Sequence, residues 1–258
     1  MTAFAYYNEI DEFAAVWLQS LMDAGAIMPG YVDTRPIQQV LPDDLDEFTQ
    51  CHFFAGIGVW SYALRSAGWP DDRPVWTGSC PCQPFSVAGE GKAFEDDRHL
   101  WPYWYPLIDL RRPPVIFGEQ VASKDGMRWL DLVSTNLEDS DYAFGAADLC
   151  AAGVGQPQVR QRLYWVADAY HQGPQGRQPA ELPERAGELP TRQSGASRDA
   201  ADHIGGRDGY YRLVEPGTFP LAARAAGDVE QLRGYGNALC APVAETFVSA
   251  YMDLNRAA

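Results

Sequence analysis

Residues 53–67 read Phe-Phe-Ala-Gly-Ile-Gly-Val-Trp-Ser-Tyr-Ala-Leu-Arg-Ser-Ala. The stretch begins with apolar residues, continues through a turn with two glycines and ends in a helical pattern from Val59 to Ala67. This succession is typical of a strand, a turn and a helix in an α/β domain. Many nucleotide-binding folds carry such a turn, so by itself it is weak evidence for a particular ligand.

The residues that follow continue the alternation of strand and helix patterns. We expect strands at Phe53, Val75 and Val115, helices at Val59–Ala67, Trp101–Leu110 and Met127–Leu137, and further apolar runs at Tyr142–Leu149 and Leu163–Ala167. A last helix is expected at Pro242–Leu254, which has one apolar face. The pattern predicts a mostly parallel sheet with helices on both faces.

Length and composition limit the class of protein. A chain of 258 residues can bury one substantial core with a small appended domain. It contains no run of about 18 apolar residues and no secretory signal, which favours a cytoplasmic location without membrane contact. Five cysteines at irregular spacing suit a reducing compartment, and the four histidines complete no metal-ligand spacing with them, so no metal is expected.

The formal net charge of −15 argues against a protein that holds nucleic acid mainly by diffuse attraction. The charge is uneven along the chain. Residues 1–50 carry nine acids and one arginine, a net charge of −8, whereas the net charge is −4 for residues 51–167 and −2 for residues 168–233. Any surface that faces DNA is therefore expected in the two later segments, with the acidic amino-terminal segment turned away.

A cysteine between two prolines, in Cys80-Pro-Cys-Gln-Pro-Phe-Ser86, follows the expected strand Val75–Gly78. This places a thiol at the mouth of the sheet. An isolated Cys-x-Cys is more often packing or a partial metal site, so other motifs must decide its role. Two more follow, Gly118-Glu-Gln-Val121 after an apolar strand and Gln158-Val-Arg-Gln-Arg162 before another.

In this order, the motifs resemble those of the DNA cytosine-5 methyltransferases of bacterial or phage type. The resemblance runs from about Phe53 to Val166 and resumes at Gly234–Ala238. It implies a Rossmann-like class I S-adenosylmethionine-dependent methyltransferase sheet, and transfer of a methyl group from S-adenosylmethionine to cytosine carbon 5 in double-stranded DNA after base flipping. A monomer is expected, whereas the recognition sequence and any restriction partner stay open.

The resemblance also implies catalytic roles. Cys82 would add to carbon 6 of cytosine and so make carbon 5 nucleophilic. Glu119 would bind ring nitrogen 3 and the exocyclic amine, in surroundings that raise its pKa. Arg160 and Arg162, on one face of an extended segment, would hold the base oxygen and a phosphate. Further substrate contacts are expected from Gln83, Ser86, Arg98 and Gln158.

One catalytic motif departs from the family pattern. Relatives usually have Glu-Asn-Val where this chain has Glu119-Gln120-Val121. The acid is kept, but the neighbouring amide is one methylene longer. We therefore expect a slightly different positioning of Cys82 or Glu119.

For the methyl donor, the resemblance implies Glu9 on the ribose and Asp33 on the adenine amine. The glycine turn would approach the cofactor closely, and the expected contacts also include Phe54, Ala55, Gly56, Ile57, Gly58, Ile10, Thr34, Pro81, Asn237 and Ala238. An acid at the carboxyl end of the strand beside a glycine turn is where a ribose diol would lie. For Asn237 the alternative is that Gly-Asn only forms a turn before the last helix.

The order of these units is unusual. Two strand–helix units normally separate the glycine turn from the Pro-Cys motif, but only 22 residues lie between Gly58 and Pro81. Residues 1–47 contain what is missing, which predicts a circular permutation in which the second and third strands precede the first. The helix at 59–67 must then change face or make a rare left-handed crossover. Alternatively, residues 1–47 are an unrelated acidic helical extension.

We expect three regions along the chain. Residues 1–167 would form the catalytic and cofactor-binding domain, 168–233 a small irregular target-recognition module, and 234–258 a turn and helix that return to the catalytic domain. Residues 168–209 lack periodicity, and Asp208–Gly217 is the one convincing strand-and-turn element of the module. Tyr210, Tyr211 and Arg212 would contact bases or form the core of the module.

Two other functions fit the same motifs. The chain is then a cytosine-5 methyltransferase of transfer RNA, or a catalytically inactive DNA-binding relative that keeps the base pocket. The short recognition segment and the altered motif order support the inactive relative. Candidate residues for every chemical role speak against it.

Overall fold

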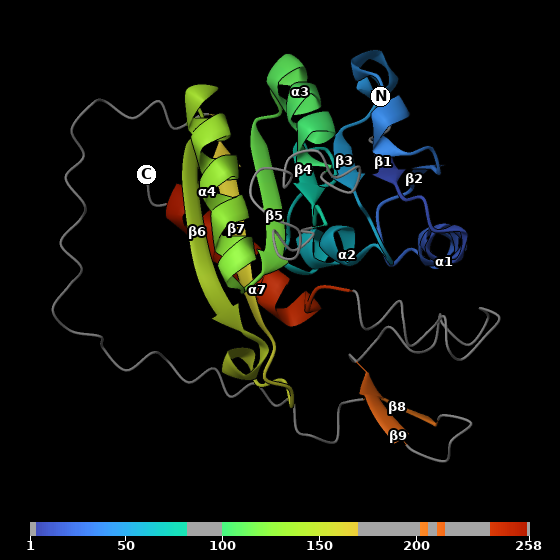
Figure 1. The fold of residues 1–258 in the computed structure, drawn as a ribbon. Helices are drawn as coiled ribbons and strands as arrows, with labels where there is room; N and C mark the ends of the chain where they lie inside the picture. Colours follow the sequence, from blue (N-terminus) through green and yellow to red (C-terminus); the bar gives the residue numbers. More distant parts are fainter. Residues whose placement is uncertain (1–3, 82–99, 170–201, 206–210, 215–237, 257–258) are drawn as a thin grey trace, which may run out of the picture.

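The computed structural model describes residues 4–81, 100–169, 202–205, 211–214 and 238–256. Its centre is a seven-stranded sheet with the order β2-β1-β3-β4-β5-β7-β6 (Figure 1). The first five of these strands are mutually parallel, whereas β7 runs antiparallel to both β5 and β6. The strands are β1 (Ala5–Asn8), β2 (Gly30–Asp33), β3 (Gln50–Phe53), β4 (Val75–Gly78), β5 (Val115–Val121), β6 (Ala143–Cys150) and β7 (Gln161–Asp168). The α/β fold class predicted from the sequence is confirmed.

Helices cover both faces of the sheet, and each face has its own apolar core. The first core joins the sheet to α1 (Glu12–Asp23), α2 (Val59–Ser66) and α7 (Ala241–Arg256). The second joins it to α3 (Trp101–Arg111), α4 (Lys124–Asp139) and the short 3-10 helices η1 (Ile37–Gln39) and η2 (Pro42–Leu45). Figure 1 shows α4 in front of β6 and β7, with α7 passing behind them. A further 3-10 helix, η3 (Ala151–Val154), follows β6.

Side-chain alternation explains how strands in the middle of the sheet contribute to both cores. In β1, Tyr7 lies in the first core and Tyr6 in the second, because successive strand residues point to opposite faces.

Two helix starts are fixed by side chains. Asp11 accepts hydrogen bonds from the amides of Phe13 and Ala14 at the start of α1, and Ser123 caps α4 in the same way.

The connection through α2 has the opposite hand to its neighbours. The chain moves from β1 to β2 through α1, and from β3 to β4 through α2 on the same face but in the opposite direction along the sheet. Since these strands are parallel, the two crossovers must have opposite hands. The return from β2 to β3 passes η1 and η2 on the other face and has the hand of the α1 crossover. Crossovers are right-handed in about 98% of cases, so the exception is α2. Of the two alternatives raised by the sequence, the structure has the left-handed crossover.

The predicted module contains more regular structure than its composition suggested. Within residues 168–209, which were expected to lack regular elements, β8 (Asp202–Gly205) pairs antiparallel with β9 (Tyr211–Val214). The expectation was wrong for β8, because hydrogen bonds to a partner strand override weak local propensity. The β9 strand lies inside the predicted strand-and-turn element, whereas Tyr210 lies outside the described residues.

In the described ranges, no helix combines the length and apolar character needed to cross a membrane.

Candidate active site

The carboxyl ends of β1 and β3 meet at Glu9, one residue beyond β1. Its carboxylate accepts hydrogen bonds from two backbone amides, Oε2 from Gly56 at 2.7 Å and Oε1 from Asp11 at 2.9 Å. The amide of Ala55 donates to the carbonyl of Asn8 at 3.0 Å. Burial raises the pKa of Glu9, although the backbone hydrogen bonds partly offset this effect. The structure thus brings Glu9 against the glycine turn, 47 residues later in the chain.

The turn itself is held in an unusual backbone conformation. Phe54, Gly56 and Gly58 all have positive φ angles, of 51°, 54° and 78°. A methyl group added to Gly56 would meet no heavy atom within 4 Å, so the space above this residue is open among the described residues. At Gly58, an added methyl group would instead lie 2.9 Å from Leu18 Cδ2 in α1. The turn therefore leaves room for a ligand at Gly56 and packs closely at Gly58.

Asp33, at the end of β2, lies next to Glu9 in the sheet, where the Glu9 amide donates to the Asp33 carbonyl at 3.0 Å. Its side chain is buried and makes an ion pair with Arg35 at 2.6 Å and a hydrogen bond from Tyr6 at 2.7 Å. Burial alone would raise the pKa of Asp33, but the hydrogen bonds from Arg35 and Tyr6 outweigh it and hold the pKa below its ordinary value. Sequence reasoning missed Arg35, which is recognisable as one of only two charged residues between Asp23 and Asp43.

Glu119 is a buried acid in β5. Arg162 Nε, in β7, lies 2.9 Å from Glu119 Oε1. Burial raises the pKa of Glu119, and the charges of Arg162 and Arg160 offset part of this increase, as does a hydrogen bond with Ser79. The predicted direction of the pKa shift is confirmed. Ser79 is a second residue that sequence reasoning missed, although it lies three positions before Cys82.

Gln120, next to Glu119, connects β5 to the cysteine motif. Its side-chain Nε2 donates to the carbonyl of Cys80 at 3.0 Å, and its Oε1 accepts from the amide of Val121 at 2.8 Å. Both the side chain of Gln120 and that of Cys80 are buried. The longer amide thus fixes the backbone immediately before Pro81 and Cys82.

The two arginines of the Gln158–Arg162 motif make different contacts. Arg160 Nη2 donates to the carbonyl of Ala238, just before α7, at 2.6 Å, whereas Arg162 pairs with Glu119. The charges of both arginines lower the pKa of Glu119. Gln158 is exposed on the segment before β7. Five predicted residues, Cys82, Gln83, Ser86, Arg98 and Asn237, lie outside the described residues.

These contacts form two adjoining groups at the carboxyl ends of the parallel strands. The first contains Glu9, the glycine turn and the Asp33–Arg35 pair, and it offers oxygens and backbone amides to a polar ligand. The second contains Glu119, Arg162 and the backbone before Pro81, and it offers a buried acid with a paired cation. No group of three or more His, Cys, Asp or Glu side chains in the described part of the chain is arranged to hold a metal ion.

Comparison with known proteins gives a consistent family. The model of the C-5 cytosine-specific DNA methylases matches residues 69–205, more than half of the chain. Type II methyltransferase M.HhaI of Haemophilus parahaemolyticus is 35% identical over 99 residues, which are 37% of this chain and 30% of the relative. Type II methyltransferase M1.ScrFI of Lactococcus lactis subsp. cremoris is 28% identical over 169 residues, 63% of this chain and 41% of the relative.

The match therefore covers less than half the length of either relative. Among solved structures, DNMT2 of Spodoptera frugiperda aligns with a TM-score of 0.43 and 17% identity, over 69% of this chain and 54% of that one.

Proposed function

Because the chain belongs to the family of C-5 cytosine-specific DNA methylases, we propose that it transfers a methyl group to carbon 5 of cytosine in DNA. One observation carries the proposal. The buried acid Glu119 forms an ion pair with Arg162, while its neighbour Gln120 holds the backbone that leads to Cys82. The acid and the thiol-bearing loop are thereby coupled through two successive residues of one strand.

Cys82 is the proposed nucleophile. Carbon 5 of cytosine is a poor nucleophile, so the thiolate first forms a bond between its sulfur and carbon 6. The electron pair of the 5,6 double bond becomes available at carbon 5, and negative charge spreads toward ring nitrogen 3. After methyl transfer, loss of the proton from carbon 5 expels the thiolate and restores the double bond. The target base must leave the duplex for this attack.

Glu119 is the proposed partner of ring nitrogen 3 and of the exocyclic amine. When protonated, its carboxyl group donates a hydrogen bond or a proton to nitrogen 3 as negative charge develops there. Burial supports this role because it raises the pKa of Glu119 and favours the protonated form. Arg162 Nε lies 2.9 Å from Glu119 Oε1, and its hydrogen bond to this oxygen holds the carboxyl group in place.

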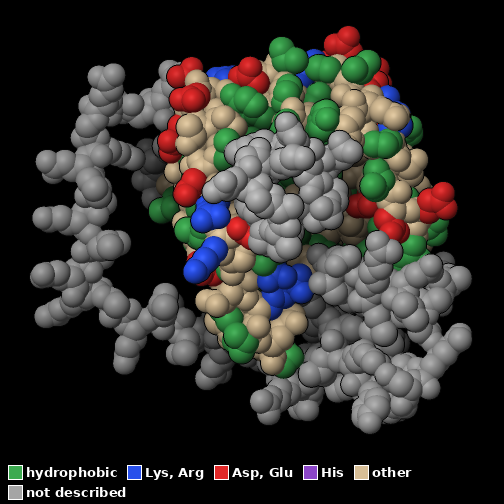
Figure 2. Space-filling view, in the orientation of Figure 1, with side chains coloured by type: hydrophobic (Ala, Val, Ile, Leu, Met, Phe, Trp, Pro, Cys, Tyr) green, Lys and Arg blue, Asp and Glu red, His purple; other side chains and the backbone are tan. Residues whose placement is uncertain are grey.

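Arg160 and Arg162 are proposed to hold the base oxygen and a neighbouring phosphate. A guanidinium group has five donors, and Arg162 uses two of its nitrogen atoms, Nε on Glu119 and Nη1 on the carbonyl of Gln161, so donors on Arg162 stay available for a substrate. On the face in Figure 2, Lys and Arg side chains lie in the lower middle of the described surface, and others lie among the Asp and Glu side chains along its upper and right-hand margins.

The residues around Glu9 fit S-adenosylmethionine, the proposed methyl donor, which supplies an electrophilic methyl group when bound. Glu9 accepts backbone hydrogen bonds from Asp11, Gly56 and Ile10, and a carboxylate offers about four acceptor positions, so acceptor capacity stays for a hydroxyl of a ribose diol. The open space at Gly56 admits a ligand beside this carboxylate. The remaining proposed contacts are Phe54, Ala55, Ile57, Gly58, Ile10, Thr34, Pro81, Asn237 and Ala238.

The strand order supports a rearranged family fold. The strand before the glycine turn, β3, lies between β1 and β4, so the two units that usually follow the turn are represented by β1 with α1 and by β2. The proposed change affects the order of the first three strands and is not a circular permutation of the entire chain. The segment that resembles the family's final cofactor contact keeps its place before the last helix. The left-handed crossover through α2 is a consequence of this exchange.

The division into regions stays a proposal as well. Residues 1–167 and 234–258 would together form the catalytic domain, and residues 168–233 would read the sequence of double-stranded DNA. The antiparallel pair of β8 and β9 offers an ordered element in that module. The proposed Gln83, Ser86, Arg98 and Gln158 contacts to substrate complete the site.

The test is transfer of labelled methyl from S-adenosylmethionine to mixed-sequence duplex DNA, with transfer RNA as a parallel substrate. We expect wild-type protein to label DNA, Cys82→Ser to abolish labelling, and Glu119→Gln to reduce it roughly 10²-fold or more. Cys150→Ser is the matched control, since this half-buried thiol lies at the end of β6 and should not affect transfer.

The outcomes separate the candidate functions. Labelling of transfer RNA alone would replace the DNA reaction with the RNA reaction. Equal labelling by wild type and Cys82→Ser would remove the proposed nucleophile. If the protein binds DNA but labels neither substrate, the inactive relative is the better description.

A further inference from the structure

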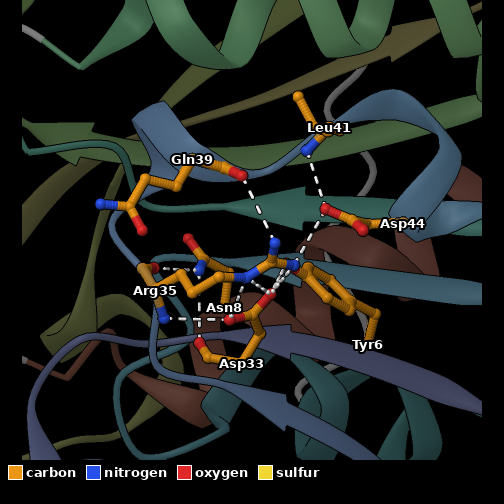
Figure 3. Close-up of polar contacts among 7 residues, drawn as sticks. All are labelled: Tyr6, Asn8, Asp33, Arg35, Gln39, Leu41 and Asp44. Atoms are coloured by element: carbon orange, nitrogen blue, oxygen red, sulfur yellow. Dashed lines mark hydrogen bonds and ion pairs between the residues drawn. The ribbon is translucent and has the colours of Figure 1, made fainter.

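The carboxylate of Asp33 is fully engaged by side chains and backbone of the protein itself (Figure 3). Its Oδ1 accepts from the amide and from Nε of Arg35, at 2.9 and 3.0 Å. Its Oδ2 accepts from Nε and Nη2 of Arg35, at 3.0 and 2.6 Å, and from the hydroxyl of Tyr6 at 2.7 Å. Only 2% of the Asp33 side chain is exposed. A ligand amine therefore finds no open acceptor on this carboxylate.

Arg35 is fixed on its other sides as well. Its Nη2 contacts Asp44 Oδ2 at 2.9 Å, and its Nη1 donates to the carbonyl of Gln39 at 3.4 Å. The backbone carbonyl of Arg35 accepts from Asn8 Nδ2 at 2.8 Å, which ties it to the end of β1. Asp44 also accepts from the amide of Leu41, so the loop after β2 is organised around one guanidinium group (Figure 3).

The side chain of Arg35 stays partly accessible beside the cofactor site. Its side chain is 41% exposed, although its nitrogen atoms already point to Asp33, Asp44 and Gln39. Hydrogen bonds from a guanidinium group lie in its plane, so these contacts occupy its edges and leave a face for stacking. Arg35 lies two residues beyond β2, beside the strand end that carries Glu9.

We propose that Arg35, and not the carboxylate of Asp33, is the side chain that contacts the adenine base of the cofactor. The inference rests on the proposed methyl-transfer function and assigns the base contact within its cofactor site. Arg35 packs its face against the ring, where the cation and the aromatic system attract each other. Asp33 and Asp44 are positioning residues that act through Arg35.

A direct bond from the adenine amine to Asp33 would require Arg35 to leave first. That movement would break three donor contacts to the carboxylate and the contact to Asp44. It would also expose a side chain that is now buried. Stacking on Arg35 needs none of these changes, and it leaves the exocyclic amine of adenine without an obligatory acceptor at Asp33.

The experiment measures binding by calorimetry, without methyl transfer, for two nucleosides. The first is S-adenosylhomocysteine, and the second is its deaminated inosine counterpart, in which an oxo group replaces the amine. We expect the wild type to bind both within about threefold of each other, and Arg35→Ala to weaken both about fivefold or more. Arg35→Lys should restore only part of the affinity, because an ammonium group keeps the positive charge but has no flat face for stacking.

Arg65→Ala is the matched control. Arg65 makes a similar ion pair with Asp71 at 2.6 Å, but it lies in α2 and bonds the carbonyls of Gly25 and Ile27 before β2. Its loss should leave the affinity for both nucleosides unchanged. Circular dichroism of each variant checks that the fold is kept.

Two results would overturn the inference while leaving the proposed function intact. Folded Arg35→Ala with wild-type affinity would remove the stacking contact. Rejection of the inosine compound by more than tenfold in the wild type would return the base contact to an acceptor for the amine, and this arm needs no variant. Failure of the wild type to bind either nucleoside would instead overturn the proposed function, and this inference with it.

Discussion

The side chain of Gln120, which is one methylene longer than asparagine, links the strand of Glu119 to the loop at Cys80, 40 positions away in the chain. The side chain reaches from β5 to the carbonyl of Cys80 and is buried along its length. The hydrogen bond from Gln120 lies in buried surroundings, where the loss of one partner of a polar group costs about 1–3 kcal/mol. The residue is therefore suited to hold the loop before Cys82 in one position relative to Glu119.

We predict that Gln120→Ala lowers the single-turnover rate of methyl transfer roughly 10- to 100-fold, since displacements near 1 Å have effects of this size. Affinity for S-adenosylhomocysteine should stay within about twofold, because the glycine turn is untouched. Gln120→Asn should keep part of the rate, as it retains the amide on a shorter chain.

The control for Gln120 is Gln50→Ala. Gln50 is also buried, and its amide donates to the carbonyls of Pro70 and Asp71. It is the first residue of β3, so it lies at the amino-terminal end of the strand, opposite the candidate site. Its loss should lower stability without a selective effect on the rate of transfer. Equal rates for Gln120→Ala and the wild type would show that this contact does not position the loop.

The raised pKa of Glu119 predicts the pH dependence of the reaction. If protonated Glu119 assists attack, the rate falls as pH rises through its pKa, because the ionised form has no proton to donate. Arg162 lowers this pKa, so Arg162→Gln should raise it further. We expect the alkaline decline in rate to move to higher pH in this variant, although the maximal rate is lower.

The measurement for Glu119 is the single-turnover rate from acidic to alkaline pH. Arg128→Gln removes the same charge from an exposed position in α4 and should leave the profile in place. A decline at unchanged or lower pH in Arg162→Gln would contradict the assignment of the titrating group to Glu119.

At the scale of elements, two neighbouring glycines allow tryptophan rings of the second core to pack directly against the strands. Gly78 in β4 and Gly118 in β5 are direct neighbours in register, and Trp165 in β7 lies opposite Gly118. A methyl group on Gly78 would overlap the ring of Trp104, and one on Gly118 would overlap the ring of Trp165. The two rings can lie this close to the strands only because no Cβ is present.

Gly118→Ala is predicted to destabilise the fold by about 1–3 kcal/mol through overpacking. For a chain of this size, that corresponds to a decrease in Tm of roughly 2–10 °C. Gly145→Ala in β6 is the control, since its added methyl group would lie 3.9 Å from Val166, an ordinary contact. Thermal unfolding that shifts equally for both variants would contradict the role of the glycine pair.

The elements were predictable where local patterns suffice. Apolar runs and turn residues indicated β3, β4, β5 and the helices between them, because those signals lie within ten or so neighbouring residues. The face on which α2 packs could not be predicted, since an apolar stripe fits either face of a sheet. The β8 strand was missed because its stability depends on pairing with β9.

The site was predictable to a different extent. Motif resemblance identified Glu119 and Arg162, and the structure brings them together at 2.9 Å. It did not reveal that Asp33 is enclosed by Arg35, because side-chain packing depends on the loop that folds back over β2. Ser79 was also missed, since its contact with Glu119 joins two strands that are 40 residues apart.

At the scale of the whole molecule, the unusual chain order should be separable from the fold. The end of α2 lies near the start of β2, because Arg65 donates to the carbonyls of Gly25 and Ile27, and β2 pairs with the start of β1 at Ala5. The segment before β3 lies near the start of β4, where the Val75 amide donates to the Thr49 carbonyl. Both junctions can therefore be reconnected with short linkers.

We predict that a chain in the order 48–67, 4–47, 68–258, with short glycine–serine linkers, folds to the same sheet. At present α2 connects β3 to β4. In the new order it connects β3 to β1, which lies on the opposite side of β3 from β4, so the crossover becomes right-handed and the rare connection disappears. Because the core contacts are unchanged, Tm should stay within about 5 °C and the affinity for S-adenosylhomocysteine within about threefold, since flexible linkers of this length change closure entropy only slightly. In the control chain, residues 48–67 follow residue 256 through the same linker. They are then far along the chain from β1 and β4, the strands that flank β3 in the sheet. A reordered chain that unfolds no more cooperatively than this control would contradict the proposal that β1, α1 and β2 are displaced units of the family fold.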